Sequence, residues 1–267
     1  MVRVGILGAG GRMGTELLSA IAHEPRAMLV GAVERPGHPA CGQRLGDALV
    51  VCANAEPVAH KSDVLIDFTT PEALSGNLRA ALAGRAAILV GTTGLGPVHQ
   101  AAIDAAARDV AVLQTANTAL GVAILARLVR EATRALGREW DVEIVEMHHR
   151  HKADAPSGTA LLLGEAAAQG RGARLGELRL PPAEGRTGPR GEGGIGFAAL
   201  RGGTVAGIHE VVLAGEGERL HLTHVAESRA IFARGALEAA LWLARQPPGR
   251  YAMTDMLGGD AARTVTS

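Results

Sequence analysis

The segment from His148 to Ala160 concentrates reactive side chains in a sequence otherwise rich in alanine, glycine and arginine. It reads His-His-Arg-His-Lys-Ala-Asp-Ala-Pro-Ser-Gly-Thr-Ala. Its three imidazoles can give or take a proton near neutral pH, and the Lys152 ammonium can hold an anion or polarise a carbonyl or imine. The Pro-Ser-Gly-Thr run can begin a helix whose N–H groups bind an anion. The segment therefore predicts acid–base chemistry on an anionic ligand.

Lysine is rare in this chain, which draws attention to Lys152. Of 27 lysine and arginine side chains, only Lys61 and Lys152 are lysines. A compact ammonium with rotatable donors differs from the planar fork of a guanidinium. Lys152 is therefore predicted to stand where arginine would not serve.

Two predicted elements position these groups. The alternation over Trp140–Met147 predicts a strand that delivers His148 at its end. A helix is predicted to begin at Ser157 or Gly158, and the N–H groups of Gly158 and Thr159 at its positive end favour a carboxylate. Strand, loop and helix would then surround one cavity. The alternative is that Ser157 is only an N-cap.

Metal binding and hydrolysis fit the segment less well. Adjacent histidines on an extended chain point to opposite faces, and the sequence contains no H-E-x-x-H motif or other ligand spacing. Ser157 lacks the G-x-S-x-G elbow of a nucleophilic serine. We therefore predict no metal site and no serine nucleophile.

The first half of the chain alternates short apolar runs with alanine-rich helical stretches, which predicts a parallel sheet covered by helices. The predicted strands are 2–7, 28–33, 64–68, 87–90 and 110–114. The predicted helices are 15–23, 73–83 and 96–107.

A glycine-rich turn between the first strand and first helix suits a dinucleotide. Gly8, Gly11 and Gly14 let the backbone turn, approach a pyrophosphate and pack the helix on the sheet, although the spacing departs from G-x-G-x-x-G. Glu34 ends the next strand, where a carboxylate accepts hydrogen bonds from ribose hydroxyls. Arg35 beside it could bind a 2′-phosphate or be a solvated surface charge. The pattern predicts NADH or NADPH, with a plain βα turn as the alternative.

Two later strand ends share this logic. The turns Asp67–Thr70 and Gly91–Gly94 should lie at the carboxyl edge of the sheet, where ligands bind in open α/β folds. Phe68, Thr92 and Thr93 are therefore candidate cofactor contacts. Asp67 has the alternative role of bonding to N–H groups of its own turn.

The second half predicts an α+β domain with a mixed sheet. Its predicted elements are a helix over 122–136, strands over 198–200, 205–209, 211–214 and 220–225, and a last helix over 231–243 that folds back on the first domain. The Gly, Pro and Arg-rich stretch 170–196 is either a loop that closes over the site or a mobile surface loop. The predicted fold is α/β, with a Rossmann-like domain over 1–118 plus 229–267 and a substrate and oligomerisation domain over 119–228.

The composition of the chain argues against nucleic acid and membranes as binding partners. The net charge is zero and aromatic residues make up 2% of the chain, so neither a basic patch nor a stacking platform for nucleic acid is expected. No run of 18 apolar residues occurs, and the chain opens in a predicted strand without signal-peptide features. We expect a cytoplasmic protein that binds neither nucleic acid nor membrane. Cys41 and Cys52 receive no role.

Three motifs are recognisable: G-x-x-G-R-M-G from Gly8 to Gly14, G-T-T-G from Gly91, and E-x-H-H-x-x-K-x-D-A-P-S-G-T-A from Glu146 to Ala160. They closely resemble the dihydrodipicolinate reductase family, and the resemblance covers nearly the whole chain, including Arg201-x-Gly203 and Gly207-x-His209. It implies an enzyme of bacterial lysine and diaminopimelate synthesis. Such an enzyme passes a hydride from NADH or NADPH to a cyclic dicarboxylate, usually as a homotetramer.

The resemblance also implies roles for matching positions. His148 would be the acid that protonates the substrate, and Lys152 would stabilise charge in that step. The substrate carboxylates would be held by His149, Lys152, Ser157, Gly158 and Thr159. The cofactor would be held at its pyrophosphate by Gly8, Gly11, Arg12, Met13 and Gly14, at its ribose by Glu34 and Arg35, and at its nicotinamide end by Gly91, Thr92, Thr93 and Asn117.

Two stretches depart from the family pattern. Thr118-Ala119 stands where Phe-Ser is common, and Gly207-Ile208-His209-Glu210 replaces the usual Gly-Glu-His-Thr. Both leave the longest motif intact but could alter cofactor choice or subunit contacts. Two other functions stay open: another NAD(P)-dependent amino or imino acid dehydrogenase on this scaffold, and a nucleotide-sensing protein without turnover.

Overall fold

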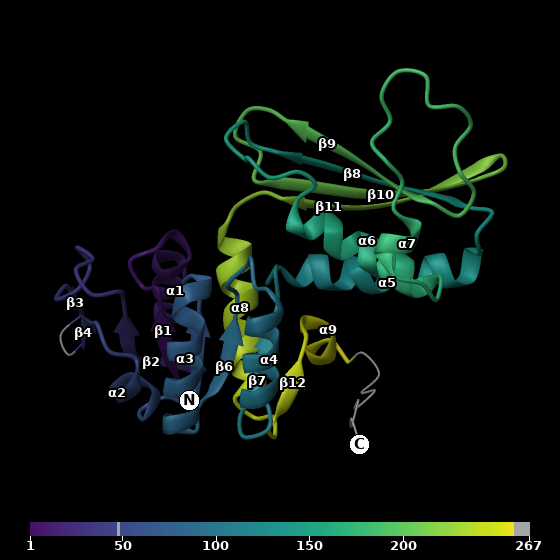
Figure 1. Cartoon of the computed structure of the whole chain (residues 1–267). Helices are drawn as coiled ribbons and strands as arrows, with labels where there is room; N and C mark the ends of the chain where they lie inside the picture. The colour runs from purple at the N-terminus through teal and green to yellow at the C-terminus, as the bar shows by residue number, and fades with distance from the viewer. Residues whose placement is uncertain (47–48, 259–267) are drawn as a thin grey trace. The chain divides into compact units, whose positions relative to one another are not determined.

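The computed structural model describes residues 1–46 and 49–258. The chain divides into two compact units. The first unit is Met1–Ala119 with the described chain from Ala230 onward, and the second unit is Leu120–Arg229 (Figure 1). Within the described ranges, no helix combines the length and apolar character needed to cross a membrane.

A largely parallel sheet forms the centre of the first unit. Its described strands lie in the order β12-β7-β6-β5-β1-β2-β4-β3, and only the β3–β4 pair is antiparallel. The strand bounds are β1 Val2–Leu7, β2 Ala27–Val33, β3 Arg44–Leu45, β4 Leu49–Cys52, β5 Val64–Asp67, β6 Ala87–Val90, β7 Ala111–Gln114 and β12 Gly249–Tyr251. The central strands are mostly apolar because both faces of the sheet are covered.

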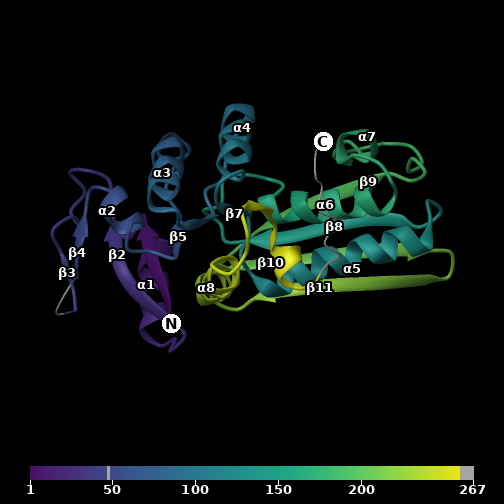
Figure 2. The same cartoon turned by 90° about the horizontal axis from the view of Figure 1, so that it is seen from below.

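Helices cover both faces of this sheet, with α1 and α8 on one side and α2, α3 and α4 on the other (Figure 2). The helix bounds are α1 Arg12–Ala22, α2 Glu56–Ala59, α3 Pro71–Gly84, α4 Pro97–Ala106, α8 Ala230–Leu243 and α9 Met253–Met256. The predicted Rossmann-like parallel sheet is confirmed. The last long helix, α8, belongs to this unit.

The second unit is a four-stranded mixed sheet with helices α5 Leu120–Leu136 and α6 Gly158–Gly170 packed on one face (Figure 1). Its strands lie in the order β11-β10-β8-β9, and only β8 and β9 are parallel. Their bounds are β8 Asp141–His148, β9 Ile195–Arg201, β10 Gly207–Gly215 and β11 Glu218–Ala226. The predicted α+β domain with a mixed sheet is confirmed.

The prediction of two strands over 205–209 and 211–214 was wrong, because β10 is continuous from Gly207 to Gly215. Glu210, which lies between the two predicted ranges, pairs with Val145 of β8 and Thr223 of β11 in the ladder. A polar residue on the face of the sheet away from the helices continues the alternation of an antiparallel strand. The helix predicted from Thr15 begins earlier, at Arg12, because Gly11 is its N-cap.

The stretch 170–196 contains the short helix α7, Leu175–Leu178, and is fastened to the sheet by an arginine. Arg190 bonds to Asp141 and Glu143 at 3.0 Å each. Both acids stand at the start of β8, whereas His148 ends that strand. The second half of the loop is thus anchored at the far end of β8 from His148, which does not support its role as a lid over this segment.

Candidate active site

Strand β8 carries two ionisable residues on its buried face. Val142 and Ile144 alternate toward the helices and are fully buried, and Glu146 and His148 continue the same face. The Glu146 side chain is only 1% exposed. A buried carboxylate needs charged or hydrogen-bonding partners, so its surroundings define the site.

Glu146 receives four hydrogen bonds. Its Oε2 lies 2.6 Å from Nδ1 of His148, and Arg201 donates to both carboxylate oxygens at 2.8 and 2.9 Å. The Ser157 backbone N–H donates to Oε1 at 3.2 Å. Burial by itself would raise the pKa of Glu146, but the hydrogen bonds from Arg201 and His148 and their charges together hold that pKa below its ordinary value.

The ionised carboxylate determines how the His148 ring is protonated. A carboxylate only accepts hydrogen bonds, so Nδ1 of His148 must donate to Glu146. The ring is thereby oriented with Nε2 as its second, reactive nitrogen. Gly207 leaves space beside that atom, since a Cβ there would approach Nε2 to 3.2 Å. The arrangement can deliver a proton from a fixed position.

Arg201 connects this pair to the loop that carries Lys152. Arg201 ends β9, directly opposite His148 in the β8–β9 register. Besides Glu146, its guanidinium donates to the backbone carbonyls of Lys152 at 3.3 Å and Asp154 at 2.7 Å. One side chain therefore holds both the carboxylate that orients His148 and the backbone of the lysine loop.

Lys152 is paired with an exposed carboxylate. Its Nζ lies 2.9 and 2.8 Å from the two oxygens of Asp154. The Lys152 side chain is 21% exposed and that of Asp154 is 63% exposed. The hydrogen bond from Lys152 holds the pKa of Asp154 below its usual range. An ammonium paired with an exposed surface carboxylate can exchange that partner for an anionic ligand.

The N-terminus of α6 reaches the same pair. Ser157 is the N-cap, as one reading of the sequence had it, and its Oγ accepts the Ala160 N–H at 3.2 Å. Its own backbone N–H goes to Glu146, so the cap is joined to the buried carboxylate. Gly158 and Thr159 form the first turn, and a Cβ at Gly158 would meet nothing within 4 Å.

His149 has a hydrogen-bond partner outside this network. Its Nε2 accepts a hydrogen bond of 3.4 Å from Arg229, a residue that the sequence had not singled out. Burial and the charge of Arg229 lower the pKa of His149. The structure thus joins His148, Ser157 and Lys152 through Glu146 and Arg201, and gives His149 a different partner.

In the first unit, the glycine turn has the close packing that the sequence predicted. Gly8 has a φ of 87°, a left-handed conformation that glycine tolerates. A Cβ on Gly14 would overlap the Gly8 carbonyl oxygen, so the helix can approach the strand only without a side chain there. Gly11 caps α1 with no side-chain hydrogen bond among the described residues, which leaves the first turn at Arg12 and Met13 suited to an anion.

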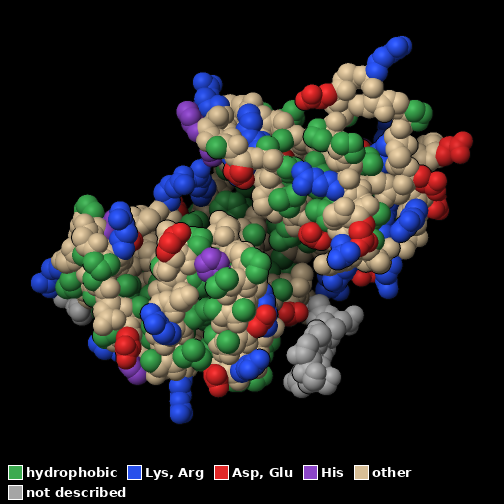
Figure 3. Space-filling view, in the orientation of Figure 1, with side chains coloured by type: hydrophobic (Ala, Val, Ile, Leu, Met, Phe, Trp, Pro, Cys, Tyr) green, Lys and Arg blue, Asp and Glu red, His purple; other side chains and the backbone are tan. Residues whose placement is uncertain are grey.

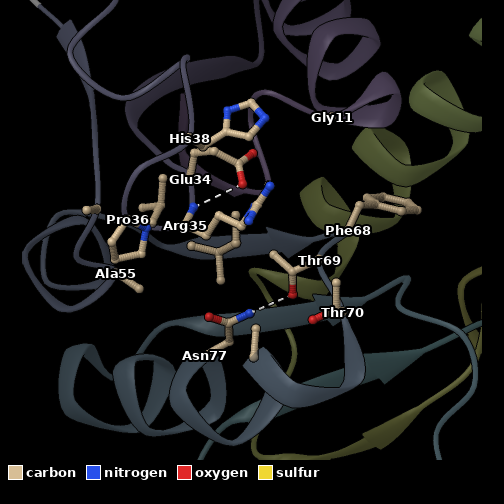
Figure 4. A pocket seen from close by; sticks show the side chains of 15 residues that line it. Gly11, Glu34, Arg35, Pro36, His38, Ala55, Phe68, Thr69, Thr70 and Asn77 are labelled. Atoms are coloured by element: carbon tan, nitrogen blue, oxygen red, sulfur yellow. Dashed lines mark hydrogen bonds between the residues drawn. The ribbon is translucent and has the colours of Figure 1, made fainter.

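A cavity of about 380 Å³ opens beside this turn (Figure 4). Glu34 lines it and is itself fixed, because its carboxylate accepts the N–H groups of Gly10 and Arg35, each at 2.9 Å. The predicted residues in its lining are Gly8, Gly11, Glu34, Arg35 and Phe68. His38 and Asn77 also line it and were not predicted.

The remaining predicted cofactor contacts lie outside the lining of that cavity, as far as the described residues define it: Arg12, Met13, Gly14, Gly91, Thr92, Thr93 and Asn117. Gly91 lies under the Phe68 ring, since a Cβ there would overlap the ring. Asn117 closes a turn by accepting the Ala119 N–H at 2.8 Å. The two strand-end turns are thus adjacent at Phe68 and Gly91.

Asp67 organises its own turn, the alternative that the sequence left open. Its buried carboxylate accepts hydrogen bonds from the Thr69 N–H at 2.9 Å, the Thr69 hydroxyl at 2.6 Å and the Asn77 amide at 3.0 Å. Burial raises its pKa. It acts as a local scaffold for the residues on either side of it.

The stretches that depart from the family pattern have defined contacts. The Thr118 hydroxyl donates to the Phe232 carbonyl at 2.7 Å, which ties the end of the first segment to α8. Glu210 lies 2.7 Å from Nδ1 of His221 on the neighbouring strand. Neither contact touches the Glu146–His148 pair.

Sequence reasoning quoted Glu146, Arg201 and His209 within motifs but assigned them no role. The alternation of β8 could have revealed Glu146 and His148, because both occupy positions where Val142 and Ile144 predict a buried face. Arg201 is 55 residues from Glu146 in sequence, and no local pattern identifies which of many arginines becomes its partner.

Both units of the chain match known proteins of one family. Residues 2–118 match the family described as dihydrodipicolinate reductase, N-terminus, and residues 121–257 match its C-terminus. The 4-hydroxy-tetrahydrodipicolinate reductase of Zymomonas mobilis is 52% identical over 96% of this chain and 97% of the relative. The one of Cereibacter sphaeroides is 48% identical over 95% and 97%.

A solved structure shares the fold. The dipicolinate-bound dihydrodipicolinate reductase from Paenisporosarcina has a TM-score of 0.77 and 24% identity, covering 94% of this chain and 97% of that one. Both halves of the sequence and its full-length relatives lead to one conclusion. The chain belongs to the dihydrodipicolinate reductase family.

Proposed function

We propose that this protein reduces 4-hydroxy-tetrahydrodipicolinate to tetrahydrodipicolinate with NADH or NADPH, and is thus an oxidoreductase of diaminopimelate and lysine biosynthesis. Relatives about half identical over nearly the whole chain support this activity. The observation that carries it is the buried Glu146–His148 pair, joined by Arg201 to the Lys152 loop. It combines a proton donor with a cation beside a helix N-terminus, as a dicarboxylate requires.

The first unit fits a nicotinamide dinucleotide. Supporting features are the tight Gly8–Gly14 turn, the first turn of α1, and a cavity lined by Glu34 and Arg35. The pyrophosphate would be held by Gly8, Gly11, Arg12, Met13 and Gly14, the ribose by Glu34 and Arg35, and the nicotinamide end by Phe68, Gly91, Thr92, Thr93 and Asn117. When bound, such a cofactor supplies a hydride.

The second unit would hold the substrate and supply the proton. Replacement of the substrate hydroxyl by hydrogen consumes one hydride and one proton and releases water. His148 donates the proton from Nε2, while Glu146 stabilises its cationic form through Nδ1. Lys152 neutralises a carboxylate in exchange for Asp154, and His149, Ser157, Gly158 and Thr159 complete the carboxylate site.

Initial-rate measurements test the function directly. Enzymatically generated 4-hydroxy-tetrahydrodipicolinate is added with NADH or NADPH, and loss of nicotinamide absorbance is followed. We expect turnover with at least one cofactor. Binding of both cofactors without turnover would support a nucleotide-sensing protein, and turnover of amino acids instead would support another dehydrogenase.

Replacing Lys152 by methionine is expected to raise the KM for the substrate by about 10- to 100-fold and to lower kcat, because a charged hydrogen bond contributes about 1.5–3 kcal/mol. Lys152→Arg should recover only part of the loss, since a planar fork does not reproduce a compact ammonium. The control is Lys61→Met, which removes the only other lysine, an exposed one. Unchanged KM and kcat in Lys152→Met would rule out the anion-binding role.

Substitutions of Glu34 and Arg35 are expected to change the KM values for NADH and NADPH in different ways. Arg35→Ala should raise the KM for NADPH about 10-fold more than that for NADH, because it removes a charge partner of the 2′-phosphate. Glu34→Ala should weaken both cofactors, since its carboxylate also fixes the Gly10 N–H. KM values for both cofactors are compared with those of Arg79→Ala, an exposed α3 control. Equal effects of Arg35→Ala on both cofactors would contradict the assignment.

Assembly and location are further proposals. We infer a homotetramer that associates through the sheet of the second unit, because the face away from α5 and α6 carries exposed Leu200 and Val225. We place the enzyme in the cytoplasm. The surface in Figure 3 interleaves positive and negative side chains, in keeping with the net charge of zero. We also propose 1–118 plus 229–267 as the cofactor domain and 119–228 as the substrate domain.

A further inference from the structure

A second buried imidazole lies beside His148 and has no part in the mechanism above. His209 lies on β10 directly opposite Glu146 of β8, so its side chain shares the face turned toward α6. Only 4% of its surface is exposed. Burying a histidine at that depth costs folding free energy unless its polar atoms are hydrogen-bonded.

His209 contacts two groups of the proposed site. Its Nε2 lies 3.0 Å from the Ser157 hydroxyl, and its ring meets that of His148 edge to face, with centroids 5.0 Å apart and planes at 72°. The Ser157 oxygen has two lone pairs, so it can accept both the Ala160 N–H and the Nε2–H of His209, which leaves the hydroxyl proton for a substrate carboxylate. The His209 imidazole therefore contacts both His148, the proposed acid, and Ser157, a residue proposed to bind a substrate carboxylate.

The charge state of His209 suits this position. Burial, reinforced by the charge of neighbouring His148, lowers the pKa of His209 to about 4. Glu146 opposes that shift, whereas His224 and Lys152 add to it. His209 is therefore neutral at neutral pH. A neutral ring adds no positive charge 5.0 Å from His148.

The other nitrogen of His209 indicates that its role is not structural stability. Nδ1 is buried without a hydrogen-bond partner among the described residues. Such an atom destabilises a fold by about 1–3 kcal/mol. A residue that lowers stability and contacts the reacting groups is more readily explained by function.

We propose that His209 is a positioning residue of the active site, which orients the Ser157 hydroxyl toward a substrate carboxylate and fixes the His148 ring by edge-to-face packing. The inference rests on the proposed function of the site. Two residues earlier on the same strand, Gly207 leaves open the space at His148 Nε2. Strand β10 thus places the His209 ring against His148 and, at Gly207, leaves the space beside its Nε2 open.

The test compares His209→Leu, which keeps volume but removes both nitrogens, with His209→Gln, whose amide can reach the Nε2 position. We expect His209→Leu to raise the substrate KM and the Kd for dipicolinate by about 10-fold, the effect of one hydrogen bond, and to lower kcat, with the NADPH KM unchanged. His209→Gln should restore the affinity for dipicolinate but not the full kcat. The thermal midpoint of His209→Leu should not fall.

A matched control and a double mutant complete the design. His224→Gln alters the neighbouring histidine of the same cross-strand row and should leave all constants unchanged. The effects of Ser157→Ala and His209→Leu on dipicolinate affinity should not add, because each removes the same hydrogen bond, the one between Ser157 and His209. If His209→Leu fails to fold, His209→Asn, whose amide reaches only the position of Nδ1, replaces it in the comparison with Ser157→Ala.

Several results would overturn the inference. These are wild-type kcat and KM in folded His209→Leu, additive effects with Ser157→Ala, or an equal loss in His224→Gln. Failure of the proposed function is distinguishable, because the wild-type protein would then not oxidise NADH or NADPH with the substrate at all.

Discussion

Replacing His148 by asparagine is expected to lower kcat by about 10²- to 10⁴-fold, the usual contribution of a positioned general acid, while the substrate KM changes little. The choice of asparagine follows from the geometry. Its amide N–H can replace Nδ1 as the donor to Glu146, so the buried carboxylate keeps its partner. Only Nε2, the atom proposed to donate the proton, is lost.

The measurement is a set of initial rates at saturating NADPH over a range of substrate concentrations. His151→Asn is the matched control, because His151 is an exposed imidazole of the same loop. It should retain activity within a few-fold of wild type. Full kcat in His148→Asn would remove His148 from the role of acid. A large rise in KM with unchanged kcat would make His148 a binding residue instead.

The sequence predicted the features that depend on local spacing. The glycines at Gly8 and Gly14 were recognised because a strand, a tight turn and a helix follow one another within a few residues. Backbone geometry confirms that physical reason, since Gly8 has a positive φ and a Cβ at Gly14 would overlap its carbonyl. The same holds for Ser157, because the Pro-Ser-Gly-Thr run identified the start of α6.

Features that depend on distant residues could not be predicted in this way. Arg201 follows a long loop, and its pairing with Glu146 arises only when β8 and β9 align in parallel. The division of β10 into two strands at residue 210 failed because Glu210 is paired in the ladder with its neighbours in β8 and β11. Tertiary partners, not local propensity, decided both outcomes.

The sequence and the structure give different information about Lys152. The rarity of lysine singled it out, and the structure shows its ammonium held by Asp154 and its backbone by Arg201. These contacts explain how Lys152 is positioned. They leave the preference for lysine over arginine to the kinetic comparison of Lys152→Arg with Lys152→Met.

Replacing Glu146 by glutamine is expected to damage both stability and catalysis. The amide cannot accept two hydrogen bonds from Arg201 and one from His148 as a carboxylate does, and it leaves the guanidinium without its counter-charge. Breaking a buried ion pair costs about 3–5 kcal/mol; with Arg201 22% exposed, we expect the lower end. Loss of the carboxylate that orients a catalytic histidine should lower kcat by about 10²- to 10⁴-fold.

The control is Glu143→Gln on the same strand. Glu143 also pairs with an arginine, Arg190 at 2.9 Å, but its side chain is 44% exposed. Exposed pairs contribute about 0–1 kcal/mol, so this variant should unfold in urea near the wild-type midpoint and keep its activity. Equal losses in the two variants would show that burial of the Glu146 pair has no special effect.

The pH dependence of stability separates the charge of Glu146 from its shape. Its pKa is lowered in the folded protein, so its ionisation stabilises the fold fully above the unfolded pKa of a glutamate, about 4.3, and that stabilisation is lost as the pH falls through the folded pKa. The difference in unfolding free energy between wild type and Glu146→Gln should therefore be largest near neutral pH and shrink in acid. A difference that stays constant with pH would mean that the carboxylate acts by packing alone, and the orientation of His148 would then need another source.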